Sequence, residues 1–332
     1  MPAMFSLVRT AAAVVLVAFM AAPALAQPRT AFPDVRGVTL TEFPRVVKLA
    51  ENVYGYEEIR DPGFTTVSLI VVGTNGVLVV DGQGSVKATQ TLLDRIRAIT
   101  PTPVKWYVVG SDHGDHTAGN SVLPKDVTYI IHPNSRAQME RDAATAMGQN
   151  LKAAADAITK GQTPPTPRPP VIVPPTAMTG ERQTIDVGGI EVQILFLGRA
   201  HTGGDLHAYL PTQRILFMSE AYLNRVFPAM RSAYPSEWVR VLDRALAMDI
   251  DRYVPGHGFI EEPKASREEL VAFQKAVQYV IEEVKRLHRL NLSVEDAATQ
   301  ANWGEYAQWM LADQQGPIAI RKVYDELEGK LK

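Results

Sequence analysis

Apolar runs typical of buried strands alternate with glycine-bearing loops in the first part of the chain. Residues 67–73 (VSLIVVG) and 76–84 (GVLVVDGQG) predict a hairpin of buried strands. Residues 85–99 repeat leucine and isoleucine at helical spacing, which predicts an amphipathic helix. Residues 104–110 (VKWYVVG) and 127–133 (VTYIIHP) predict two further strands.

A proline-rich stretch interrupts this pattern. Residues 134–161 predict a rather polar helix. The segment 163–175 (TPPTPRPPVIVPP) can form neither a helix nor a central strand, because proline lacks the amide hydrogen and fixes φ. We interpret residues 134–179 as an insertion that crosses the surface, either bordering the active site or serving as a simple tether.

Strand patterns return after the insertion and give way to helices. Residues 183–198 predict a hairpin that turns at a Gly-Gly pair, and residues 205–220 and 250–258 predict strands on either side of a helix at 236–248. From Lys264 onward the pattern is helical. Two apolar stripes there, expected to form core or a homodimer contact, comprise Leu270, Phe273, Val277, Ile281 and Val284, then Trp303, Tyr306, Trp309 and Met310.

The order of these elements predicts an α/β (α+β) fold. Strands and helices do not alternate as a regular βαβ array, so we expect an αββα sandwich, in which two mixed sheets face each other with helices outside. The predicted organisation is a catalytic domain over residues 27–262, which contains the insertion, and a C-terminal helical extension over residues 263–332.

The N-terminus has the pattern of a secretory signal peptide. Arg9 precedes an apolar run at residues 11–20, and small residues at 24–26 predict cleavage after Ala26, so residues 1–26 would be removed. An uncleaved membrane anchor is the alternative, but the run is short for a bilayer span. We expect an exported, periplasmic protein without stable membrane insertion after cleavage.

Charge and cysteine content narrow the function classes. A formal net charge of −2 provides no basic surface for nucleic acid, so we expect a small-molecule substrate and no nucleic-acid partner. The chain has no cysteine, which excludes a thiolate nucleophile and disulfides. Any metal ion must be held by nitrogen and oxygen ligands.

Four of the seven histidines lie in short glycine-flanked loops that follow apolar strands. His113 and His116 stand in GSDHGDHTAG, His201 in GRAHTGGD, and His257 in VPGHG. Neutral imidazole is a good zinc ligand, and carboxylates complete such sites. Glu220 follows the strand at 214–219 and is expected to bring a carboxylate to the same rim.

These loops resemble the motifs of the metallo-β-lactamase superfamily. Its His-x-His-x-Asp-His motif corresponds to residues 111–116, which read Ser-Asp-His-Gly-Asp-His. The resemblance runs from about Tyr54 to Gly258. It implies one metal bound by His113 and His201 and a second bound by Asp115, His116 and His257. Glu220, which replaces the usual Asp, would bridge the metals or complete the first site.

The resemblance also implies roles around the metals. Asp115 would orient the attacking water as well as bind metal. Asp81 is expected to fix the tautomer of a ligand histidine. Ser111 replaces a histidine and is a poor ligand, so we expect the longer Glu220 side chain to compensate while Ser111 stays a spectator. Tyr222 and Asn224 either donate hydrogen bonds to the substrate or serve in packing.

The predicted function is an exported metallohydrolase with one or two Zn²⁺ ions; iron or manganese would suit the same ligands. Zinc lowers the pKa of a bound water toward about 7, which allows hydrolysis of an ester, thioester, lactone or lactam carbonyl. Three alternatives remain at this point. They are a β-lactamase proper, a non-catalytic metal-binding or accessory protein on the same fold, and an iron-dependent redox enzyme.

Overall fold

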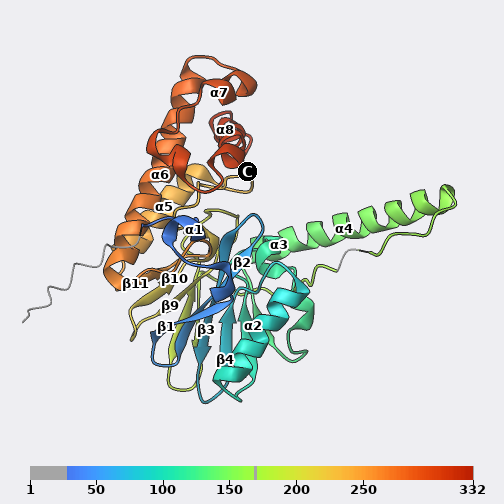
Figure 1. Cartoon of the computed structure of the whole chain (residues 1–332), viewed down its shortest axis with the longest axis vertical. Helices are drawn as coiled ribbons and strands as arrows, with labels where there is room; N and C mark the ends of the chain where they lie inside the picture. Colours follow the sequence, from blue (N-terminus) through green and yellow to red (C-terminus); the bar gives the residue numbers. More distant parts are fainter. Residues whose placement is uncertain (1–27, 168–169, 332) are drawn as a thin grey trace, which may run out of the picture.

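Two β-sheets pack face to face in the computed structural model, which describes residues 28–167 and 170–331 (Figure 1). The predicted signal peptide therefore lies outside the described residues. In the described part of the chain, no helix is long and apolar enough to cross a membrane. The layers agree with the predicted αββα sandwich.

The first sheet has six strands in sequence order. Neighbours are antiparallel from β1 to β4, whereas β4, β5 and β6 run parallel, so the sheet is mixed as predicted. The strands are β1 (Arg45–Ala50), β2 (Val53–Arg60), β3 (Phe64–Val72), β4 (Val77–Val80), β5 (Val104–Val108) and β6 (Thr128–Ile130). Strands β1 and β2 were not among the predicted elements.

The second sheet has the order β11-β10-β9-β8-β7, with β10 and β11 parallel and the other pairs antiparallel. Its strands are β7 (Arg182–Asp186), β8 (Glu191–Leu195), β9 (His207–Leu210), β10 (Ile215–Phe217) and β11 (Arg252–Val254). Gly188 and Gly189 both have positive φ in the β7–β8 turn, as the predicted hairpin requires.

Alternation along the strands explains the layers. Leu69 and Val71 of β3 pack with Ile194 and Ala208 of the second sheet in one buried cluster. Ile70 between them faces the other way, into a cluster with helix α2. Successive side chains of a strand point to opposite faces, so β3 contributes to both layers at once. This double burial accounts for its nearly continuous apolar sequence.

Helices cover the outer faces of both sheets. The α-helices of the described residues are α1 (Pro33–Arg36), α2 (Val86–Ile99), α3 (Gly114–Thr117), α4 (Pro133–Thr159), α5 (Pro235–Ala247), α6 (Pro263–Arg289), α7 (Val294–Gln300) and α8 (Ala312–Leu327), of which α2, α5 and α6 pack on the sheets. The stripe on α6 is buried against α5 and the outer face of the second sheet. Because these side chains are buried within the chain, the stripe on α6 is part of the core and is not a dimer contact.

The insertion begins at the site and then leaves it. Asn134 and Ser135, in the first turn of α4, donate hydrogen bonds to the carbonyls of Gly203 (2.7 Å) and Gly204 (3.1 Å). The rest of α4 projects away from the sheets in Figure 1, and the chain returns alongside it. The first turn of the helix thus borders the loop that carries His201.

Candidate metal centre

All predicted ligands lie on loops at one end of the two sheets. His113, Asp115 and His116 follow β5 on the loop that contains α3. His201 lies between β8 and β9, Glu220 follows β10 and His257 follows β11. Because parallel strands end at the same edge, loops far apart in sequence come together there. Except for Asp115 and His113, which are partly accessible, these residues are buried.

The first group of ligand atoms is formed by His113, His201 and Glu220. Nδ1 of His113 lies 3.0 Å from Nε2 of His201 and 3.0 Å from Oε2 of Glu220. Oε1 of Glu220 lies 3.1 Å from Nε2 of His201. Two nitrogens and one oxygen thus converge, which is the ligand set predicted for the first metal.

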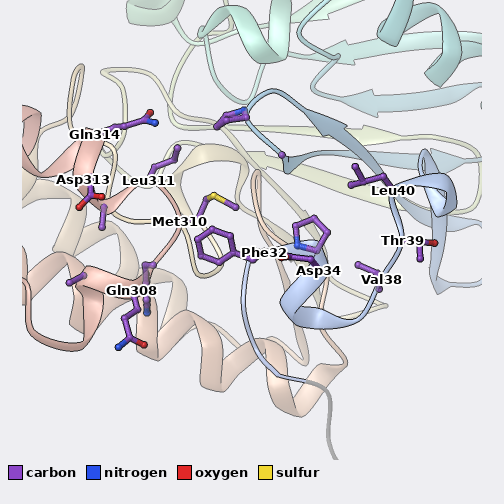
Figure 2. Close-up of a pocket in the computed structure, with 16 residues that line it drawn as sticks. Phe32, Asp34, Val38, Thr39, Leu40, Gln308, Met310, Leu311, Asp313 and Gln314 are labelled. Carbon is purple, nitrogen blue, oxygen red and sulfur yellow. The ribbon is translucent and has the colours of Figure 1, made fainter.

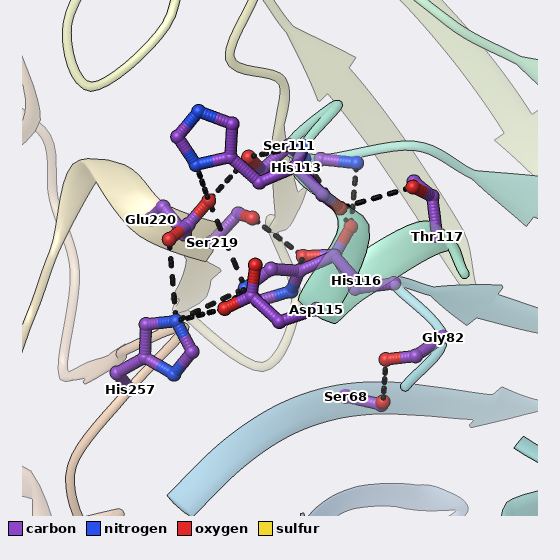
Figure 3. A network of polar contacts seen from close by, with 12 residues as sticks. Ser68, Gly82, Ser111, His113, Asp115, His116, Thr117, Ser219, Glu220 and His257 are labelled. Carbon is purple, nitrogen blue, oxygen red and sulfur yellow. Dashed lines mark hydrogen bonds and ion pairs between the residues drawn. The ribbon is translucent and has the colours of Figure 1, made fainter. Parts of the chain in front are cut away.

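The second group is formed by Asp115, His116, Glu220 and His257. Nε2 of His257 lies 3.3 Å from Nε2 of His116, 3.0 Å from Oδ2 of Asp115 and 3.2 Å from Oε1 of Glu220. Figure 3 shows the carboxylate of Glu220 between His113 and His257. Glu220 belongs to both groups, which agrees with the bridging role expected of it.

In their neutral form, two imidazoles are held as the tautomer that binds metal. Nδ1 of His257 lies 2.8 Å from the carbonyl of Thr65, which can only accept, so Nδ1 carries the hydrogen and Nε2 presents its lone pair to the site. Nδ1 of His116 lies 3.1 Å from Oδ2 of Asp81, which favours the same tautomer there. Asp81 therefore occupies the supporting position predicted for it.

The spacing of these nitrogens matches a tetrahedral ion. Zn–N bonds of about 2.0–2.1 Å separate neighbouring nitrogen ligands by about 3.3 Å. The observed separations are 3.0 Å for His113 and His201 and 3.3 Å for His116 and His257. Two nitrogens that both present lone pairs at this distance repel each other unless a proton or a cation lies between them. The donor set fits divalent metal.

The charges within the cluster depend on one another. Burial raises the pKa of Glu220, but the positive charges of His201, His113 and His116 outweigh it and hold that pKa well below its usual range. Burial lowers the pKa of His113, and the charge of Glu220 more than reverses this, to about 9. In His257, burial is likewise outweighed by hydrogen bonds to Asp115 and Glu220, and the pKa is about 9. The site therefore favours positive charge.

Ser111 contacts Glu220 directly. Its buried hydroxyl donates a hydrogen bond to Oε2 of Glu220 and accepts one from the backbone N–H of His113 (3.3 Å). That Ser111 is a spectator in metal content stays a prediction, but its hydroxyl does contact the carboxylate that both ligand groups share. The hydroxyl supports a ligand rather than supplying the missing imidazole.

Asp81 joins the loops that carry the ligands. It follows β4 with a φ of 62° and accepts hydrogen bonds from the N–H groups of Gly110 (2.7 Å) and Ser111 (3.3 Å). Its second oxygen accepts from the hydroxyl of Ser219, the residue before Glu220. One carboxylate thus positions the His116 ring, the loop after β5 and the turn after β10.

Tyr222 and Asn224 have packing roles in the structure. The ring of Tyr222 is fully buried beside Phe273, with ring centroids 5.9 Å apart. The amide of Asn224 donates to the carbonyl of Phe259 at 2.7 Å. Neither residue lines the pocket above the metal ligands. The alternative of hydrogen bonds to substrate is therefore not supported for either.

A pocket of about 230 Å³ opens above both ligand groups. Arg60, at the end of β2, lines it and forms an ion pair with Asp115. Leu311, Gln315 and Ile318 of the C-terminal extension form part of its wall. Sequence reasoning missed these four residues, because no motif marks them and the extension is far from the ligands in sequence.

Comparisons with known proteins agree with this geometry. A family model described as the metallo-beta-lactamase superfamily matches residues 60–257. The 2,4-dinitroanisole O-demethylase subunit alpha of Nocardioides sp. (strain JS1661) is 25% identical over 201 residues, which cover 60% of this chain and 54% of that protein. The chain thus spans about half the length of this curated relative.

Two solved structures illustrate the shared fold. The stereoselective inverting sec-alkylsulfatase Pisa1 from Pseudomonas sp. superposes with a TM-score of 0.67 at 15% identity, covering 90% of this chain and 52% of that chain. A metallo-β-lactamase from Pontibacter korlensis gives a TM-score of 0.55 at 19% identity, covering 70% of this chain and 98% of that chain. At such identities the likeness concerns the fold alone.

Proposed function

Because this chain belongs to the metallo-β-lactamase superfamily, we propose that it is a metal-dependent hydrolase of small molecules. Its substrate would carry an ester, thioester, lactone or lactam carbonyl. The observation that supports this most is the convergence of four imidazoles and two carboxylates, all of which except His116 line one pocket. Zinc is the proposed ion, and the predicted export to the periplasm is part of the proposal.

The chain's own residues suit such a reaction. When bound, the metal ions lower the pKa of water toward about 7 and polarise the substrate carbonyl. His113, His201 and Glu220 would hold one ion, and Asp115, His116 and His257 the other, with Glu220 shared. Asp115 would accept a hydrogen bond from the attacking water and so orient it, while Arg60 restrains that carboxylate through their ion pair.

Two alternatives receive less support. A β-lactamase proper is supported by the fold alone, and Ser111 and Glu220 depart from the usual ligand pattern. For a non-catalytic protein, Ser111 was the main argument, but its hydrogen bond to Glu220 gives it a supporting role within an intact cluster. The names of the relatives add two substrate types to the screen, an aryl methyl ether and a secondary alkyl sulfate.

The test compares His116→Ala with a matched control, His288→Ala on α6. Zinc-, manganese- and iron-reconstituted proteins are screened against carboxylic esters, thioesters, lactones, β-lactams, an aryl methyl ether and an alkyl sulfate. We expect the parent and His288→Ala to hydrolyse at least one carbonyl substrate, and His116→Ala to lose at least 100-fold in kcat/KM, which is about 3 kcal/mol. Equal rates for His116→Ala would exclude catalysis at this site.

A further inference from the structure

An apolar groove lies beside the metal pocket, between the N-terminal segment and the C-terminal extension (Figure 2). It encloses about 820 Å³, within the range of about 300–1,000 Å³ typical of small-molecule sites. Phe32, Val38 and Leu40 form one side, and Trp309 and Met310 form the other. No motif pointed to this groove, because its two sides are far apart in sequence.

The groove borders the metal pocket. Pro62, Leu311 and Gln314 line both cavities, so the two spaces meet across these three side chains. Leu311 has a φ of 67°, an uncommon conformation for a branched residue. Backbone strain of this kind persists where the surrounding structure enforces it, often at ligand sites. Here it places a leucine side chain at the junction of the two cavities.

The charged residues around the groove indicate what charge its occupant can carry. Asp34 and Asp313 line it, both exposed, and no Lys, Arg or His is among its described lining residues. Carboxylates at the rim disfavour an anionic occupant. Leu40 leaves 62% of its surface exposed there, so an apolar side chain is available to an occupant of the groove. A neutral, apolar chain fits these features.

We propose that the groove binds the uncharged alkyl or acyl chain of a substrate whose carbonyl lies at the metal ligands. This rests on the proposed hydrolase function and assigns it a substrate class, esters with a chain of roughly eight carbons or more. The shared wall at Leu311 supports this occupant over a second copy of the chain, since an alkyl chain bound in the groove lies next to the metal pocket.

Binding can be measured without catalysis. The probe is 11-bromo-1-undecanol, whose bromine quenches tryptophan fluorescence on contact, and Trp309 lines the groove. We expect saturable quenching in the parent, loss of most of it in Trp309→Phe, and at least fivefold weaker binding in Ala307→Phe, which fills the groove. Ala155→Phe, on an exposed position of α4, is the matched control and should bind as the parent does.

Chain-length dependence then tests the link to the site. With p-nitrophenyl acetate, octanoate and dodecanoate, we expect kcat/KM to rise at least tenfold from C2 to C8. Ala307→Phe should raise KM for octanoate at least fivefold and reduce the preference for octanoate over acetate, whereas Ala155→Phe should keep the parent's preference. Quenching without hydrolysis of any ester would support the apolar occupant but overturn the assignment of an ester substrate, while the substrate screen above tests the hydrolase separately.

Other outcomes overturn the proposal while leaving the hydrolase intact. These are ester hydrolysis with no chain-length preference, and quenching that is absent or equal in parent, Trp309→Phe and Ala307→Phe. Sedimentation at the same protein concentrations distinguishes the competing occupant. A dimer whose formation abolishes quenching would assign the groove to a second copy.

Discussion

At the scale of single residues, Glu220 is the centre of the site. An aspartate is one methylene shorter, and the longer side chain lets Glu220 contact both ligand groups from the turn after β10. Ser111 stands where the family motif carries a histidine, and its hydroxyl donates to the same carboxylate. The two departures from the motif are therefore coupled. Ser111 does not provide the imidazole of the motif, but it supports Glu220, which supplies a ligand in its place.

This coupling predicts how metal binding responds to substitution. Glu220→Ala should lose one metal equivalent, because it removes the only carboxylate of the first group. Ser111→Ala should keep both equivalents but bind the first ion about 10-fold more weakly, as is usual when a partner of a ligand is removed. Metal content after dialysis and competition with a chelator measure both effects.

The double variant provides the control for that experiment. If Ser111 acts through Glu220, then Ser111→Ala has no further effect on affinity in the Glu220→Ala background. An equal loss in both backgrounds would show that Ser111 acts independently of Glu220. Circular dichroism of each variant checks that the fold is retained.

The ligands were predictable from the sequence, but the pocket around them was not. His113 and His257 stand in loops with strong local signatures, so the resemblance could place them. Arg60 and Ile318 stand in ordinary strand and helix sequence. The position of Ile318 at the pocket depends on how α8 packs, and that of Arg60 on where β2 ends beside the ligand loops, and no local pattern encodes either.

At the scale of elements, local pattern failed where burial depends on distant partners. Strand β2 (VYGYEEIR) contains Glu57, a charged residue of a type that is usually exposed to solvent. Glu57 is fully buried, because it pairs with Arg45 and accepts a hydrogen bond of 2.7 Å from the N–H of Ile260. The strongly apolar strands, β3 and β4, were predicted correctly since their burial is evident in their own composition.

Strand β9 contains a histidine that should make stability depend on pH. Burial lowers the pKa of His207 to about 4, below its usual 6.5, although its Nδ1 lies 3.3 Å from the carbonyl of Met218. The unfolded chain binds this proton more tightly than the folded chain. The stability contributed by neutral His207 is therefore fully present above pH 6.5 and is lost as the pH falls to about 4, by about 3 kcal/mol.

The measurement is the free energy of unfolding by urea at pH 7 and pH 4, with chelator present throughout. His207→Gln retains an N–H donor for Met218 and cannot gain the proton. The parent should lose about 3 kcal/mol more than this variant between the two pH values. Groups other than His207 titrate alike in the parent and the variant, so their effects on stability cancel in the comparison. Equal losses of unfolding free energy in the two proteins would contradict the pKa assigned to His207.

At the scale of the whole molecule, the C-terminal extension is joined to the site by ring contacts. Phe273 of α6 packs on Trp238 of α5 with centroids 5.7 Å apart, and Trp238 packs on the ligand His201 at 5.4 Å. All three residues are buried. Removing the extension would expose this cluster, so we expect the two predicted parts of the chain to fold as one cooperative unit.

Calorimetry of the full chain tests whether the two parts unfold together. We expect a single transition whose calorimetric and van't Hoff enthalpies agree. Phe273→Ala removes a fully buried ring and should destabilise by about 3–5 kcal/mol, which moves the whole transition to lower temperature. Lys275→Ala, at an exposed position of α6, should change stability by less than about 0.5 kcal/mol. The contrary result is two transitions, only one of which shifts in Phe273→Ala. It would show that the extension unfolds independently, so that the part of the pocket wall formed by the extension can separate from the metal ligands.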